Sequence, residues 1–487
     1  MNPSQRIAAI IGGGPAGLTA AYVLSKSQTQ FRPIVFEASN LVGGIARTEN
    51  YKGYRFDIGG HRFFTKIPEV RSLWHEICGE DFITRPRLSR IYFRGKYYAY
   101  PLKLLNALVN LGPYEASRIL LSYAKWQVFP HRSEESFEQW VINRFGGRLY
   151  WHFFRTYTEK VWGVSCSTIT ADWAAQRIKN LSLRKAIWNA ISGANDTASL
   201  IEQFEYPRLG PGMMWEKCRD LICKRGGEVR MHASVTRLNR NGHRIESIEI
   251  EQPGGTQRVC ADEFISTMPL ADLISCIAPS PPDHVRAAAK RLKYRDFLIV
   301  VLILDHPDPF PDNWIYVHSP EVKVGRIQNF RAWSPDMVPD PGRSSVGLEY
   351  FCHARDNLWT SADADLIALA TDELNLLGLA SKMSVVDGIV IRQEKAYPVY
   401  DIGYGKVVGV IKAWLGTLEN LQTVGRNGLH RYNNQDHSML TAMLAVRNLA
   451  GEHHDVWNVN VERAYHEEFE TAAVPQAAAA HDLHFST

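Results

Sequence analysis

The fold is decided by residues 7–24, which read IAAIIGGGPAGLTAAYVL. The apolar run Ile7–Ile11 predicts a buried parallel strand, and the residues from Leu18 onward predict a helix. Three glycines between them have the G-x-G-x-x-G spacing: Gly12, Gly14 and Gly17. In this arrangement the first glycine permits a tight turn, the second lets a pyrophosphate approach the backbone, and the third lets the helix pack on the strand. Pro15 and Ala16 open the helix, so we expect them to contact the same ligand.

A second strand and an acidic residue complete the unit. Residues 33–36 are again apolar, and Glu37 follows them, twenty residues after Gly17. A carboxylate at this place accepts hydrogen bonds from a ribose diol. A glycine-rich turn in an unrelated α/β protein would account for the glycines but not for the order of strand, glycines, helix, strand and acid. The segment therefore predicts a dinucleotide-binding βαβ unit.

The residues after Glu37 favour FAD as the dinucleotide. Residues 41–48 read LVGGIART and place Gly43, Gly44 and Arg47 just beyond the ribose acid. Glycines expose backbone N–H groups to phosphate, and Arg47 offers a fixed positive charge. The segment resembles the second fingerprint of the flavin amine oxidase superfamily, in which it lies along the FAD pyrophosphate. The alternative for Arg47 is a solvated loop charge.

Composition limits the class of protein. The 55 Lys and Arg residues nearly balance the 51 Asp and Glu residues, so the net charge of +4 does not predict a nucleic-acid partner. None of the seven cysteines forms a C-x-x-C pair, so we expect no metal site and a reduced, cytoplasmic setting. The longest strongly apolar run, Phe297–Leu304, is too short for a transmembrane segment.

The pattern of elements predicts an α/β fold built from two interleaved domains. We expect a Rossmann-like, doubly wound FAD-binding domain from residues 1–95, 208–280 and 390–455. An α+β substrate-binding domain is expected from residues 96–207 and 281–389. Residues 102–200 read mostly as helices, and strands and helices alternate over residues 283–395. Residues 472–487 are expected to form a flexible tail.

Several short motifs farther along the chain share one resemblance. They are GGH at 59–61, LYWHFFRTYTEKVW at 149–162, IKNLSLR at 178–184, VGRI at 324–327, Tyr397-Pro398, and Gly425-Arg426 followed by Tyr432. Together they resemble the motifs of UDP-galactopyranose mutases, which belong to the flavin amine oxidase and protoporphyrinogen oxidase superfamily.

The resemblance implies a role for each motif. It places His61 beside the isoalloxazine near N5, with Gly59, Gly60, Gly425 and Arg426 also at the flavin, and Trp162 at the substrate. Val235 is expected at the cofactor as well. The substrate phosphates would be bound by Arg184, Arg326, Tyr397 and Tyr432.

The same residues have alternatives that do not involve a ligand. Each arginine could form a surface or interdomain salt bridge, and His61 could be a hydrogen-bonded core histidine. Trp162, Tyr397 and Tyr432 could be core aromatics. If the arginines and phenols converge, they suit a diphosphate-linked substrate, because arginine binds phosphate in a bidentate way.

Two residues differ from the mutase motifs, so the sequence leaves the reaction open. Gly60 stands where the mutases have proline, and Asn434 stands where they usually have aspartate. The first hypothesis is a mutase-like enzyme of polysaccharide or glycoconjugate biosynthesis. It would act on a sugar nucleotide or a related anionic glycosyl substrate, with flavin N5 as the reactive centre and an electron donor for the flavin. The alternative is an oxidoreductase of the protoporphyrinogen oxidase or amine oxidase type, which passes hydride from substrate to FAD. A non-catalytic FAD-bearing scaffold is a third class, and a homo-oligomer is left open.

Overall fold

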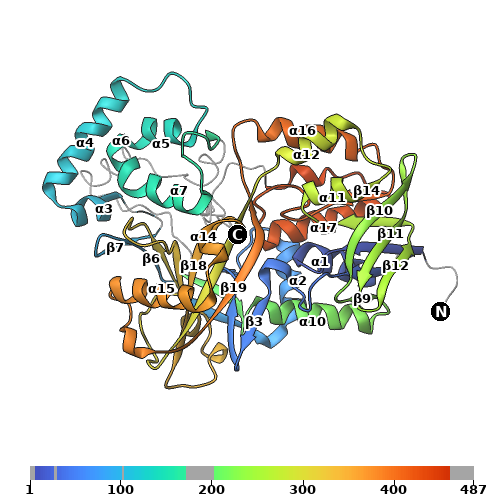
Figure 1. The fold of residues 1–487 in the computed structure, drawn as a ribbon, viewed down its shortest axis with the longest axis horizontal. Coiled ribbons are helices and arrows are strands. Elements are labelled where there is room, and N and C mark those ends of the chain that lie inside the picture. The colour runs from blue at the N-terminus through green and yellow to red at the C-terminus, as the bar shows by residue number, and fades with distance from the viewer. Residues whose placement is uncertain (1–5, 27–29, 101, 103, 172–201, 461–487) are drawn as a thin grey trace, which may run out of the picture.

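The computed structural model describes residues 6–26, 30–100, 102, 104–171 and 202–460 (Figure 1). Arg184 and the tail at 472–487 lie outside these residues. A five-stranded parallel sheet contains β1 (Arg6–Ile11), β2 (Phe31–Phe36), β9 (Glu228–Arg230), β13 (Glu263–Ser266) and β20 (Leu421–Thr423), in the order β20-β13-β1-β2-β9. The predicted strands at 7–11 and 33–36 are confirmed, and β13 joins this sheet beside β1.

The five-stranded sheet is apolar on both faces because both faces are covered. Ala8 and Ile10 of β1 pack in one core with helix α1 (Pro15–Lys26), whereas Ala9 and Ile11 pack in a second core. The first face is also covered by α10 (Pro211–Lys224) and α17 (Gln435–Leu449), both in contact with α1. The second carries a four-stranded sheet of β10 (Ser234–Asn241), β11 (Arg244–Gln252), β12 (Gly255–Cys260) and β14 (Ile277–Ala278).

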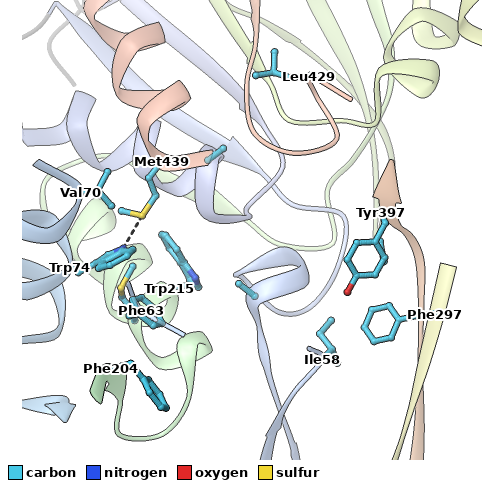
Figure 2. Packing of buried hydrophobic residues seen from close by; sticks show 14 of the residues in the cluster. Ile58, Phe63, Val70, Trp74, Phe204, Trp215, Phe297, Tyr397, Leu429 and Met439 are labelled. Atoms are coloured by element: carbon cyan, nitrogen blue, oxygen red, sulfur yellow. Dashed lines mark hydrogen bonds between the residues drawn. The ribbon is translucent and has the colours of Figure 1, made fainter. Parts of the chain in front are cut away.

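Figure 2 shows how the first core joins distant segments. The indole N–H of Trp74, on α2 (Pro68–Cys78), donates to the sulfur of Met439 on α17 at 3.0 Å. The indole N–H of Trp215 on α10 donates to Gln435 Oε1 at 3.0 Å. These bonds satisfy buried tryptophan donors while the rings fill the core, and they fix α2 and α10 against α17.

A seven-stranded sheet forms the second half of the molecule. Its order is β19 (Val385–Pro398), β15 (Tyr294–Leu304), β18 (Ser344–Cys352), β17 (Arg326–Asn329), β16 (Trp314–Val317), β6 (Ser89–Phe93) and β7 (Lys96–Ala99). The apolar run Phe297–Leu304 is a fully buried strand within this sheet. Helix α15 (Asp363–Leu376) packs on β15 and β19. The hairpin β6-β7 at 89–99 and the strand at 385–398 therefore belong to this sheet, and the domain boundaries expected at 95 and 390 stay a prediction.

A helical lobe lies at the outer edge of the molecule, beside the seven-stranded sheet (Figure 1). It contains α3 (Leu104–Leu111), α4 (Pro113–Val128), α5 (Phe137–Phe145), α6 (Gly147–Leu149), the π-helical segment η3 (Tyr150–Arg155) and α7 (Thr156–Trp162). The helices expected after residue 102 are confirmed as far as residue 162. In the described part of the chain, no helix is long and apolar enough to cross a membrane.

Candidate functional site

Two glycine segments face each other where β1 meets α1. Gly12 has a φ of +100°, and a side chain on Gly17 would place its Cβ 1.9 Å from the carbonyl oxygen of Gly12. Gly43 N–H donates to the carbonyl of Gly13 at 2.8 Å, and a Cβ on Gly44 would lie 3.2 Å from the Cα of Gly14. The two loops approach backbone to backbone, and a side chain at Gly17 or Gly44 would obstruct this approach.

A third glycine segment reaches the same place from the end of β20. A Cβ on Gly425 would lie 3.1 Å from the Cβ of Ala16, and Gly425 N–H donates to Thr441 Oγ1 on α17 at 2.9 Å. The segments thus meet at the N-terminus of α1, where Pro15 begins the helix. Exposed N–H groups and the helix dipole favour an anion at such a position. The arrangement fits the pyrophosphate of FAD.

Glu37 is held at the carboxyl end of β2. Its Oε2 accepts the N–H of Gly13 at 2.6 Å, and its Oε1 accepts the N–H of Ser39 at 2.9 Å. A carboxylate retains further lone pairs for a ribose diol, so the residue fits the predicted role. The backbone N–H of Ala233 donates to the Glu37 carbonyl at 2.8 Å, which brings the start of β10, and with it buried Val235, close to this end of the site.

Arg47 has partners within the protein. Its Nε lies 2.6 Å from Glu49 Oε1, and its Nη1 donates to Gln393 Oε1 at 2.8 Å and to the Gly44 carbonyl at 3.2 Å. The arginine therefore fastens the second glycine loop to β19, and Glu49 balances its charge. Its role toward the pyrophosphate stays a prediction.

His61 lies between the glycine loops and the arginines. Its Nε2 is 2.9 Å from the carbonyl oxygen of Ile45. Burial, together with the positive charges of Arg426 and Arg326, lowers the pKa of His61 to about 3. The ring is therefore neutral near pH 7, with Nε2 carrying the proton that it donates to Ile45 and Nδ1 as an acceptor.

Gly60 has a steric role that its sequence position did not reveal. A Cβ at Gly60 would lie 1.5 Å from the ring of Trp314, so the ring occupies the volume that any side chain at 60 would need. Trp314 also lies under Arg326, whose Cζ is 5.0 Å from the ring centroid. Gly60 thus allows Trp314 to pack beside the site. Gly59, with a φ of +130°, supplies the turn.

An aromatic and cationic cluster brings together four of the predicted residues. The rings of Tyr397 and Tyr432 stack with centroids 5.5 Å apart, and Trp162 lies 6.3 and 6.0 Å from them. Arg426 Cζ is 5.5 Å from the Tyr397 ring and 4.9 Å from the Tyr432 ring. Burial raises the pKa of Tyr397 to about 12, so its hydroxyl stays protonated. Figure 2 shows the Tyr397 ring beside Phe297 and Ile58.

Arg426 and Arg326 differ in their partners. Arg426 donates only to backbone carbonyls, Nε to Asn433 at 2.9 Å and Nη1 to Ala396 at 3.3 Å, and no described carboxylate pairs with it. Arg326 donates through Nη2 to Tyr397 Oη at 2.7 Å, and the same nitrogen lies 2.5 Å from Glu349 Oε2. Arg426 therefore presents an unbalanced positive charge.

Several residues of the site were missed from sequence. Glu349 pairs with Arg326, and Tyr157 lies close enough for the charge of Arg326 to affect its hydroxyl. Glu349 could have been found from sequence, because it is an acidic residue in the apolar strand 344–352 and a buried charge needs a partner of opposite charge. Nothing in the sequence pointed to Trp314, since a tryptophan in a predicted strand usually packs in the hydrophobic core. No group of three His, Cys, Asp or Glu side chains suited to a metal occurs among the described residues.

The fold, together with the three glycine segments at the N-terminus of α1, defines a flavoprotein of the two-domain FAD-dependent enzyme class. Residues 15–388 match the family described as flavin containing amine oxidoreductase, and the chain belongs to this family. It is an FAD-dependent enzyme, as the two glycine fingerprints predicted.

Two solved structures share the fold. A reduced UDP-galactopyranose mutase has a TM-score of 0.82 and 20% identity, covering 95% of this chain and 100% of that one. A putrescine oxidase bound to putrescine has a TM-score of 0.59 and 15% identity over 92% of this chain and 99% of that one. Among curated proteins, coproporphyrinogen III oxidase of Mycobacterium tuberculosis (strain ATCC 25618 / H37Rv) is 25% identical over 437 residues, covering 83% of this chain and 90% of that protein. The predicted resemblance and fold class are confirmed.

Proposed function

We propose that the protein is a mutase-like flavoenzyme that acts on a sugar nucleotide or a related anionic glycosyl substrate of polysaccharide or glycoconjugate biosynthesis. The observation that carries the proposal is the unbalanced charge of Arg426 above the stacked phenols of Tyr397 and Tyr432. A cation with hydroxyl donors beside it suits phosphate oxygens.

Two buried donors add support. Within the described residues, neither Nε of Arg326 nor Nε1 of Trp314 has a hydrogen-bond partner. Both side chains are more than nine-tenths buried and they lie against each other. Buried donors are normally paired, so these two favour a ligand rich in acceptor oxygens.

The residues have separable roles in this proposal. Bound FAD supplies N5, a ring nitrogen that can exchange an electron pair or a hydride with a substrate carbon. Tyr397 and Tyr432 bind the phosphates, as would Arg184, which lies outside the described residues. Arg426, which the resemblance places at the flavin, lies over both phenol rings and is proposed to contact the phosphates as well. Arg326, already balanced by Glu349, holds Tyr397 in place and can add its own contact. Trp162 and Trp314 exclude water, and neutral His61 orients the flavin edge without adding charge.

The reaction can be tested directly. Dithionite-reduced protein is incubated without oxygen with UDP-galactose and a panel of other nucleotide sugars, and the products are separated by chromatography. Formation of a ring-isomerised sugar by reduced but not oxidised protein is expected, because this reaction needs reduced flavin although no net oxidation occurs. Absence of product from every nucleotide sugar would overturn the proposal.

A second candidate function rests on the sequence relationship to coproporphyrinogen III oxidase, which extends over 83% of the chain. In this function the protein is an oxidoreductase, and Arg426 and Arg326 would bind substrate carboxylates in place of phosphates. Oxidised protein is mixed with coproporphyrinogen III without oxygen. Bleaching of the flavin and appearance of porphyrin fluorescence would establish the oxidoreductase instead of the mutase.

A further inference from the structure

One face of α4 combines exposed apolar and basic side chains. Tyr114, Leu121 and Val128 are 73%, 72% and 68% exposed. Arg118 and Lys125 alternate with them at helical spacings of three and four, so all five lie on one side of the helix. We call this set, together with Trp151 of η3, the α4 face.

The opposite, inner side of α4 makes the contacts with the rest of the described structure. Ile119 is fully buried, and Ser122 Oγ accepts the N–H of Arg148 at 3.1 Å. A Cβ at Gly146 would meet the backbone of Tyr123 at 2.8 Å, so the α5-α6 turn packs tightly under α4. Among the described residues, the contacts that hold α4 lie on this side, and the apolar residues of the α4 face do not belong to the core clusters.

A hollow of about 510 Å³ opens beside the α4 face, between α4 and η3. It is lined by Arg118, Leu121, Ser122, Arg148, Trp151 and His152. Glu115 lies among these cations: its Oε2 is 2.9 Å from Nη2 of Arg148 and 3.9 Å from Nη1 of Arg118, and its Oε1 is 2.8 Å from His152 Nε2. One carboxylate cannot balance both arginines, so the hollow retains positive charge.

Trp151 marks the rim of the hollow. Its ring is 57% exposed, and the guanidinium of Arg155 stacks on it with Cζ 4.0 Å from the centroid. Exposed aromatic rings and long basic side chains are the residues that occupy the boundary between lipid headgroups and acyl chains.

We propose that the α4 face binds the surface of an anionic phospholipid membrane. Leu121, Val128 and Trp151 would enter the headgroup region, while Arg118 and Lys125 bind lipid phosphates. An apolar contact and a basic contact together are the two signals that give stable surface binding.

A second copy of the chain fits the α4 face less well. In a symmetric dimer the face would meet itself, which brings Arg118 and Lys125 of one copy close to those of the other. Like charges oppose such a contact, whereas anionic lipid is complementary to it. Figure 1 places α4 at the edge of the molecule opposite β10, β11 and β12, so a planar surface can reach it. The proposal does not depend on the substrate of the enzyme.

Vesicle flotation of the full-length, FAD-loaded protein tests the proposal. The vesicles contain phosphatidylcholine alone or with about one third phosphatidylglycerol, a fraction that gives a strongly negative surface. We expect binding to the anionic vesicles that weakens with salt, and a loss of roughly tenfold or more in Leu121→Asp and in Lys125→Glu. Because both side chains are exposed, neither substitution should change the thermal unfolding midpoint.

The matched controls lie on another surface. Met383 is 94% exposed, and its neighbour Lys382 forms only an exposed ion pair with Asp372. Met383→Asp and Lys382→Glu should leave vesicle binding unchanged. Absence of binding to anionic vesicles, equal binding to neutral ones, or equal loss in the controls would overturn the proposal. A dimer, detected by light scattering and dissociated by Leu121→Asp, would identify a protein interface instead.

Discussion

Arg326 and Glu349 form an ion pair that is almost completely removed from solvent. Nη2 of Arg326 lies 2.5 Å from Oε2 of Glu349, and the side chains are 9% and 0% exposed. The pairing register of β17 and β18 places the two residues directly opposite each other. Gln328 Nε2 donates to Glu349 Oε1 at 2.8 Å, which holds the carboxylate in place.

Glu349→Gln should destabilise the protein strongly. The substitution leaves the buried guanidinium of Arg326 without its counter-charge, and breaking a buried pair in this way costs about 3–5 kcal/mol. Urea unfolding measures the effect. Asp372→Asn removes one partner of the exposed pair with Lys382 and should change the free energy of unfolding by less than about 1 kcal/mol. Equal effects of the two substitutions would contradict a buried ion pair.

Arg426→Ala should weaken binding of the anionic substrate by about 2–5 kcal/mol, because its charge has no carboxylate partner in the described structure. Titration monitored by flavin fluorescence gives the dissociation constant. Arg343→Ala, on an exposed loop, is the control and should leave the dissociation constant unchanged.

Arg326→Ala should also weaken binding by about 2–5 kcal/mol if this arginine contacts a phosphate. Arg326→Ala also leaves the buried carboxylate of Glu349 without its counter-charge, which lowers stability as well as affinity. Arg426→Ala therefore measures the effect on binding more directly.

Gly60→Ala should cost about 1–3 kcal/mol in stability, because the added methyl group overlaps the ring of Trp314. In the Gly60→Ala background, Trp314→Ala should cost less than it does in the wild type, since the overlap disappears with the ring. A double-mutant cycle from urea unfolding should give a coupling of about 1–3 kcal/mol. Additive effects would show that the two residues do not interact.

Asp57 should make the stability depend on pH. It accepts hydrogen bonds from Tyr206 Oη and, at 2.8 Å, from Thr48 Oγ1, yet burial raises the pKa of its carboxyl from 3.8 to about 7. Between these values the folded protein holds a proton that the unfolded chain releases. The stabilisation from this group is therefore complete below about pH 4 and is lost as the pH rises through 7.

Asp57→Asn removes this titration and keeps one of the two acceptor oxygens. From about pH 4 to pH 8 the wild type should lose roughly 2–4 kcal/mol of unfolding free energy more than the variant. Buried histidines with lowered pKa values, such as His61 and His318, are present in both proteins and cancel in the difference. Parallel pH profiles would mean that Asp57 is ionised throughout.

Gly14→Val should reduce FAD content while the fold persists. A Cβ at Gly14 would lie 3.7 Å from Gly44 Cα, an ordinary van der Waals distance, and the valine side chain adds volume between the two glycine loops. The ratio of flavin to protein absorbance measures occupancy, and circular dichroism checks the fold. Gly409→Val is the control, because a Cβ there meets nothing within 4 Å. Full occupancy in Gly14→Val would argue against a pyrophosphate between the loops.

The cofactor class could be predicted from the sequence alone. Gly12, Gly17 and Glu37 lie within one βαβ unit, where spacing along the chain sets their positions relative to one another. The predicted convergence of Tyr397, Tyr432, Arg426 and Trp162 came from the resemblance, and the structure brings these four side chains together.

Only the tertiary structure decided how the charges are balanced and what Gly60 accommodates. Glu349 opposes Arg326 because β17 and β18 pair in one register, Glu49 balances Arg47, and the Trp314 ring fills the space over Gly60. Such partners are chosen by strand register and by packing between segments far apart in the chain, and no local pattern records either. The sequence therefore determined which cofactor the protein binds, whereas the folded structure decided that Arg47 and Arg326 have carboxylate partners and that Arg426 has none among the described residues.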